Sequence, residues 1–164
     1  MKTTSFLTAI FVVLSLLASN TCFAAKEGEA NDQNYAYDTQ MVDGRISTHT
    51  IFKVTNQNTL TPYLKHEFSY LADGKVSCKK TLYWIADAQE WKEVAIYNYT
   101  YFDNTCNIEL SVWNARKNTM VKNRRYIYST DSDNNLTMSI NFDWNAKDDN
   151  WVVDGEILEA TPIA

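Results

Sequence analysis

The chain has 164 residues, enough for one domain with a core of its own, and carries 15 basic against 20 acidic residues. Its adjacent basic residues form only short pairs, such as Lys79-Lys80 and Arg124-Arg125, so the sequence lacks a patch that could neutralise a row of phosphates. Nucleic acid and anionic membrane surfaces are therefore not expected as partners.

The segment from Met1 to Ala24 has the pattern of a secretory signal peptide. Lys2 supplies a positive charge, and the apolar stretch from Phe6 to Leu17 is too short to span a bilayer with proper flanks. We predict cleavage after Ala24, with export to the periplasm, the cell surface or the medium and no transmembrane segment in the mature chain. A lipoprotein signal acylated at Cys22 is the alternative, disfavoured because Thr21 stands where a smaller residue is expected.

After a polar leader at residues 25–33, composition predicts a single all-β domain over residues 34–160. Ten Tyr, five Trp and seven Phe accompany only four Gly and two Pro. Aromatic and β-branched residues suit the half-buried surface of a pleated sheet.

Four turn signals divide this domain at intervals of about 30 residues, each following a pair of aromatic residues such as Tyr99 and Tyr101. Asp, Asn and Gly tolerate the positive φ that tight hairpins require. The domain is therefore expected to consist of four copies of one hairpin unit. The turns are Asp43-Gly44, Asp73-Gly74, Asp103-Asn104 and residues 131–134.

A second motif, Trp-x-Ala, recurs between these turns with nearly the same period, starting at Trp84, Trp113 and Trp144. After each Trp, at a constant spacing, stands Trp91, Met120 or Trp151. We expect Trp84 to face Trp91, and Trp144 to face Trp151, across hairpin ends.

Alternation of apolar and polar residues predicts which side chains share a face of the sheet. Extending the Trp84–Trp91 pairing places Cys78 opposite Tyr97, and Trp91 on the same face as Tyr97 and Tyr99. The third hairpin breaks this pattern, because Trp113 has the opposite parity to Ile108 and Leu110. Either a β-bulge before Trp113 switches the faces, which we favour, or Trp113 points to the other side.

The expected fold is an antiparallel up-and-down meander of about nine strands, curled or closed into a barrel-like sheet. Curling or closure would cover the apolar face and protect free edges. A homodimer that buries two such faces is the alternative to a monomer.

Other candidate chemistry is weak. The predicted register separates Cys78 from Cys106, so both are expected as free thiols rather than a disulfide. His49 and His66 belong to no catalytic motif, and no cofactor, metal ion or enzymatic activity is expected. Asp131, Asp133 and Asn135 open like a calcium loop, but Leu136 stands where that loop requires Gly.

The aromatic side chains are the remaining candidates for binding. Facing Trp pairs close hairpin ends, or they present flat surfaces to a glycan or a protein. A platform requires exposed indoles, whereas a hairpin closure buries them. The candidate binding residues are Trp84, Trp91, Tyr97, Tyr99, Trp144 and Trp151.

The leader, the stretch from Tyr99 to Asp103 and the Trp144-Asn145-Ala146 motif together resemble a secreted bacterial family, the domain of unknown function 3836. The resemblance covers essentially the whole chain. It implies an all-β fold and an extracytoplasmic location, and it supplies no catalytic residues.

Three functions fit these features. The first is a non-enzymatic binding or interaction module. The second is a carrier of a small lipid-like or glycan ligand inside a barrel, with Lys80, Glu93 or Arg124 orienting a polar head. The third is a structural protein of the envelope.

Overall fold

The structure is a computed structural model, and it describes residues 35–55, 59–155 and 158–159. The predicted signal peptide, the cleavage after Ala24 and the polar leader lie outside these residues. The described residues form ten β-strands and contain no helix. The strands are β1 (Tyr35–Val42), β2 (Arg45–Val54), β3 (Leu60–Tyr70), β4 (Val76–Ile85), β5 (Glu90–Phe102), β6 (Thr105–Asn114), β7 (Thr119–Thr130), β8 (Leu136–Asn145), β9 (Asn150–Val153) and β10 (Leu158–Glu159).

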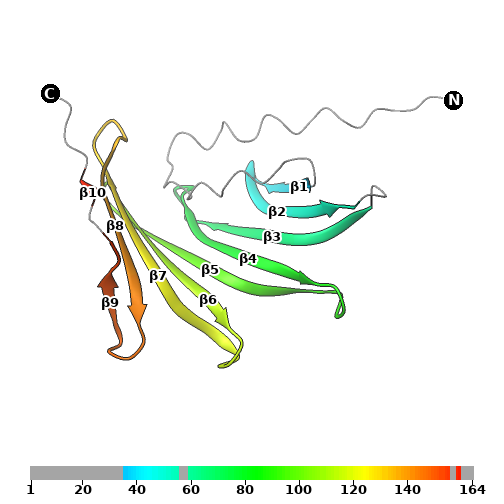
Figure 1. Cartoon of the computed structure of the whole chain (residues 1–164). Helices are drawn as coiled ribbons and strands as arrows, with labels where there is room; N and C mark the ends of the chain where they lie inside the picture. The colour runs from blue at the N-terminus through cyan, green and yellow to red at the C-terminus, as the bar shows by residue number, and fades with distance from the viewer. Residues whose placement is uncertain (1–34, 56–58, 156–157, 160–164) are drawn as a thin grey trace.

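These strands make one antiparallel sheet, in which β1 to β8 are neighbours in the order of the sequence. The short strands β9 and β10 both pair with β8. The predicted meander is therefore confirmed. The sheet curls strongly (Figure 1), but β1 and the last described strands do not pair with each other, so closure is wrong and curling is correct.

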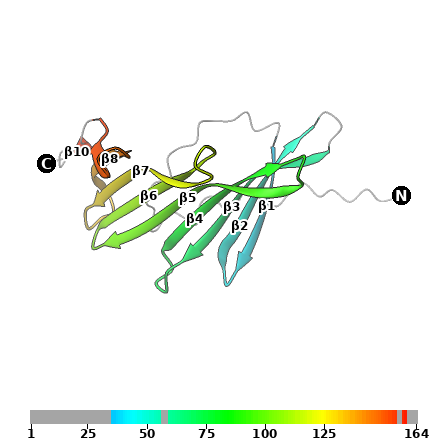
Figure 2. The same cartoon turned by 90° about the horizontal axis from the view of Figure 1, so that it is seen from below.

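The turn signals lie where the hairpins reverse. Asp43, Gly44, Gly74, Asp103 and Asn134 all have positive φ, as tight turns demand. The four turns follow one another along one end of the sheet (Figure 2). The hairpins that carry the Trp-x-Ala motifs turn at the opposite end.

Three β-bulges recur at the same place in successive repeats. The register shifts after Ile51, Thr81 and Leu110, and one extra residue stands in the strand opposite each shift. The extra residues are Tyr63, Val94 and Asn123.

The bulge at Val94 corrects two predictions. Trp84 does pair with Trp91, but beyond the bulge Cys78 lies opposite Asn98, and Tyr97 lies opposite Lys79. Because one extra residue reverses the alternation, Trp91 lies on the face opposite to Tyr97.

The third hairpin also differs from the favoured prediction. Its bulge is at Asn123 in β7, and β6 keeps its alternation through to Trp113, which pairs with Met120. The favoured bulge before Trp113 is therefore wrong, and Trp113 lies on the face opposite to Ile108 and Leu110.

The register thus defines two faces of the sheet. The tyrosine face contains Tyr97, Tyr99, Cys106, Ile108 and Leu110, and the tryptophan face contains Trp84, Trp91, Trp113, Trp144 and Trp151.

The most deeply buried apolar side chains lie at the centre of the tyrosine face. Cys106, Ile108 and Leu110 on β6 are each less than a tenth exposed. Nearby, the outer tyrosines of the aromatic pairs connect neighbouring strands: Tyr70 donates a hydrogen bond to the carbonyl of Ile46, and Tyr101 does so to Val76. The aromatic pairs before the turns therefore have a structural role.

The two cysteines of the domain lie on different strands, Cys78 on β4 and Cys106 on β6. Cys78 carries a free thiol, so no disulfide joins it to Cys106.

Candidate binding site

Each complete Trp pair lies directly across a hairpin end on the tryptophan face. The ring centroids of Trp84 and Trp91 are 5.1 Å apart at an interplanar angle of 64°. Those of Trp144 and Trp151 are 4.9 Å apart at 66°. This edge-to-face packing is favourable for aromatic rings. All four indoles are half-buried, so each pair closes its hairpin and still presents part of its surface.

A shallow depression of about 400 Å³ lies beside the first Trp pair. One wall is formed by Trp84 and Trp91, and the rest comes from β1, β2 and β3. The residues from those three strands are Asp38, Gln40, Thr48, Thr50, Phe52, Pro62 and Lys65.

Cross-strand pairing brings the polar members of this lining together. Asp38 lies opposite Thr50, Gln40 lies opposite Thr48, and Thr50 lies opposite Lys65. The depression therefore offers a carboxylate, an amide, two hydroxyls and an ammonium within one hollow. Such groups can both donate hydrogen bonds to a polar ligand and accept them from it.

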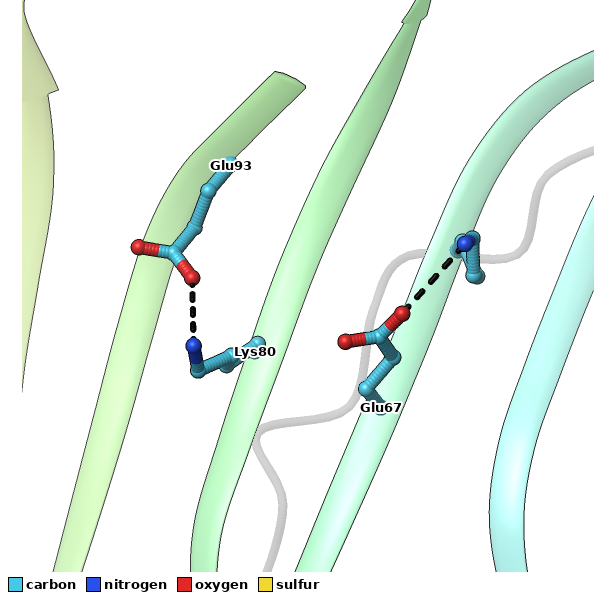
Figure 3. Close-up of polar contacts among 4 residues, drawn as sticks. Glu67, Lys80 and Glu93 are labelled. Carbon is cyan, nitrogen blue, oxygen red and sulfur yellow. Dashed lines mark hydrogen bonds and ion pairs between the residues drawn. The ribbon is translucent and has the colours of Figure 1, made fainter. Parts of the chain in front are cut away.

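Lys65 is held in place between two partners. Its Nζ lies 3.3 Å from Oε1 of Glu67 and 4.9 Å from the ring centroid of Trp91. A second ion pair, Lys80 to Glu93 at 2.9 Å, crosses the neighbouring strands of the same face (Figure 3). Lys65 is the more buried of the two lysines, with 20% of its side chain exposed against 45% for Lys80. A partly desolvated cation over an indole gains more from that contact than an exposed one.

The second Trp pair repeats part of this arrangement in the last hairpin. Arg125 lies with its Cζ 4.6 Å from the ring centroid of Trp151 and also pairs with Glu109. The lining of the depression includes neither Trp144 nor Trp151. The two pairs therefore share a construction but differ in their surroundings.

The remaining predicted residues, Tyr97 and Tyr99, lie on the opposite face. Burial, followed by the nearby tyrosines 101 and 97, raises the pKa of the Tyr99 hydroxyl above its ordinary value of 10.0. Nζ of Lys79 lies 5.4 Å from the ring centroid of Tyr97. The six predicted residues consequently do not form one site, and only Trp84 and Trp91 line the depression.

Sequence reasoning missed the polar part of the site. Asp38, Gln40, Thr48 and Thr50 read as ordinary polar positions of alternating strands. The available signal was the repeat itself, since extending the pairing scheme to the first three strands would have set these residues in adjacent rows.

The other candidates have structural explanations. The Asp131 carboxylate accepts hydrogen bonds from the backbone N–H groups of Asp133 and Asn135 and from the Asn135 side chain, so it organises its own turn. The groups proposed to orient a carried ligand form strand ion pairs, Lys80 with Glu93 and Arg124 with Asp143.

Two further features, a metal site and a membrane-spanning helix, are absent from the described residues. They contain no group of three or more His, Cys, Asp or Glu residues arranged to hold a metal ion. No helix long and apolar enough to cross a membrane occurs in this part of the chain.

Comparison with solved structures supports the fold. A protein of unknown function from Bacteroides fragilis superposes with a TM-score of 0.71 at 22% identity, covering 81% of this chain and 96% of its own. Two proteins described as members of the DUF3836 family, from Bacteroides vulgatus and Parabacteroides distasonis, are 27% and 28% identical to this chain, with TM-scores of 0.50 and 0.52. They cover 54% and 58% of this chain and 90% of their own chains.

Among curated proteins, none matches the chain. The model of one family, described as a family of unknown function (DUF3836), matches residues 1–125. That match spans well over half of the sequence, and two of the similar structures are described as members of the same family. The chain therefore belongs to the DUF3836 family.

Proposed function

We propose that the protein is an exported, non-enzymatic glycan-binding module, and that the depression beside Trp84 and Trp91 is its binding site. The observation that carries this proposal is the combination of an aromatic wall with several polar side chains in one hollow. Binding sites for small ligands typically pair an apolar surface with a few convergent polar groups.

Sugars fit this chemistry in both respects. Their C–H faces suit the half-buried indoles, which are large, rigid and apolar on their faces. Their hydroxyl groups both donate and accept hydrogen bonds, which suits the carboxylate of Asp38, the amide of Gln40 and the hydroxyl of Thr48. Lys65 would supply one further donor already oriented by Glu67 and Trp91.

The carrier alternative loses support because it needs a closed barrel, and the described strands form an open sheet. Export rests on the signal-peptide pattern between Met1 and Ala24. An extracytoplasmic protein would meet glycans at the cell surface or in the medium.

The test uses a glycan array followed by titration of any ligand found. Thr48→Val removes a hydroxyl and keeps the side-chain shape, so we expect Kd to rise roughly threefold to tenfold, as for one lost hydrogen bond. Trp91→Ala removes one of the two indoles of the aromatic wall, together with the ring beneath Lys65, and should abolish detectable binding.

Trp151→Ala is the matched control, because it opens an equivalent Trp pair that does not line the depression. It should weaken the fold about as much as Trp91→Ala and leave Kd unchanged. Equal loss of binding in both Trp variants, or no glycan bound by the wild type, would overturn the proposal.

A further inference from the structure

The strand β1 forms one edge of the sheet. Among the described strands it pairs only with β2, so a row of backbone N–H and C=O groups along its other side has no sheet partner there. The opposite edge is different, because the four residues of β9 and the two of β10 cover parts of β8.

β1 lacks the usual protection of an edge strand. Its eight residues include no Pro, Lys or Arg, and Asp38 is its only charged residue. The bulge between β1 and β2 places its extra residue, Ser47, in β2, so β1 itself stays regular. Met41 and Val42 at its end are 53% and 60% exposed.

We propose that this edge pairs with a second copy of the chain, with β1 antiparallel to β1 of the partner around a two-fold axis at Thr39. A two-fold axis presents the same surface from both copies, so the edge must be complementary to itself. The sequence of β1 meets this condition in one register.

Centring the axis on Thr39 sets Asp38 opposite Gln40 and Tyr37 opposite Met41 of the partner. It also covers the exposed Val42 with Ala36. Cross-strand pairs of this kind, carboxylate with amide and aromatic with thioether, are favourable.

Neighbouring registers fail. An axis at Asp38 would bring two carboxylates face to face, and like charges directly opposite each other destabilise a sheet. An axis at Gln40 would set Asp38 against Val42, leaving a charge on an apolar side chain. An axis between two residues is excluded because it would pair residues from opposite faces of the sheet.

The proposal does not depend on glycan binding. It does bear on the depression, because Asp38 and Gln40 contribute to its lining. Pairing at β1 would therefore place the two depressions side by side across the two-fold axis, giving one assembly with two adjacent sites.

The first test measures mass and cross-linking. We expect a dimer by light scattering at about 100 µM, since the population of a small interface depends on protomer concentration. In a Cys78→Ser background, Thr39→Cys should cross-link to itself under mild oxidation, because opposite residues in such a pair lie about 5 Å apart.

Tyr35→Cys is the matched control, because the proposed register sets it opposite residue 43 rather than itself, and it should not cross-link. A wild type that stays monomeric at that concentration overturns the proposal. So does a dimer in which Tyr35→Cys cross-links as readily as Thr39→Cys.

The second test exchanges charges. Gln40→Asp sets a second carboxylate opposite Asp38 at two places in the dimer. The dissociation constant of the dimer should therefore rise about tenfold. Adding Asp38→Asn restores the carboxylate–amide pair with the roles exchanged, and should restore the dimer. A dimer unaffected by Gln40→Asp would contradict the register.

Discussion

His49 and His66 lie opposite each other on β2 and β3, with parallel rings whose centroids are 6.4 Å apart. A threonine flanks each ring: His49 Nδ1 is 2.8 Å from the hydroxyl of Thr39, and His66 Nδ1 is 3.1 Å from that of Thr81. This row crosses four neighbouring strands on the tyrosine face. Burial, then the charge of Lys79 and then His49, lowers the pKa of His66 from 6.5 to about 4.

Because the pKa of His66 is low in the folded protein, we expect the protein to lose stability in mild acid. Between pH 6.5 and 4 the unfolded chain binds a proton at His66 and the folded chain does not, so stability falls as the pH falls through that window. The free energy of unfolding should drop by roughly 3 kcal/mol from this residue by pH 4. Burial and Lys79 lower the pKa of His49 in the same direction.

Urea unfolding of the wild type and of His66→Gln at several pH values isolates this contribution. The carboxylates titrate in both proteins, so their effect cancels in the difference. The difference in unfolding free energy should be constant above pH 6.5 and shift in favour of the variant below it. A difference independent of pH would contradict the low pKa.

The incomplete third Trp hairpin offers a stabilising substitution. Trp113 faces Met120, where the other two repeats place a second Trp. Met120→Trp should complete an edge-to-face pair and raise the free energy of unfolding by about 0.5–1.5 kcal/mol. Met120→Leu, which adds no ring, should change it little, and chemical denaturation of both variants distinguishes the aromatic contribution from simple apolar packing.

The sequence predicted the meander because its signals are local. Asp103 at positive φ and the Trp144–Trp151 pair follow from residue type and spacing alone. The three bulges at Tyr63, Val94 and Asn123 escaped prediction because these residues share no side-chain chemistry, and each bulge reverses the alternation that follows it. Prediction of the faces therefore failed at Trp91, one bulge away from Tyr97.

The site was predicted in part for a related reason. Trp84 and Trp91 stand out because tryptophan is rare and their spacing repeats. Thr48 and Gln40 do not, because only the curvature of the sheet and the packing of its first strands turn a polar row into a depression. Curvature is a property of the whole sheet, and it leaves no local pattern.

The adjacent arginines of β7 should differ in their contribution to stability. Arg125 pairs with Glu109 and lies over Trp151 with 28% of its side chain exposed, whereas Arg124 is 46% exposed beside Asp143 and Asp154. We expect Arg125→Ala to cost about 1–2 kcal/mol and Arg124→Ala less than about 0.5 kcal/mol. Thermal unfolding of both variants checks the order, and equal costs would show that the indole contact adds nothing.

The turns at Gly44 and Gly74 allow a matched test of backbone strain against crowding. Both glycines have positive φ, 75° and 90°, so Ala at either position is strained by about 1 kcal/mol. A Cβ at Gly44 would meet nothing within 4 Å, but at Gly74 it would lie 3.1 Å from Nη2 of Arg45. That guanidinium also lies over the ring of Tyr70, so moving it weakens a second contact. Gly74→Ala should therefore cost about 2 kcal/mol against about 1 for Gly44→Ala.

The control introduces Gly74→Ala into a protein that already carries Arg45→Ala. Because the crowded guanidinium is gone there, Gly74→Ala should cost only about 1 kcal/mol, as Gly44→Ala does. An excess that survives in the Arg45→Ala background would place the cost in the backbone conformation of Gly74 instead.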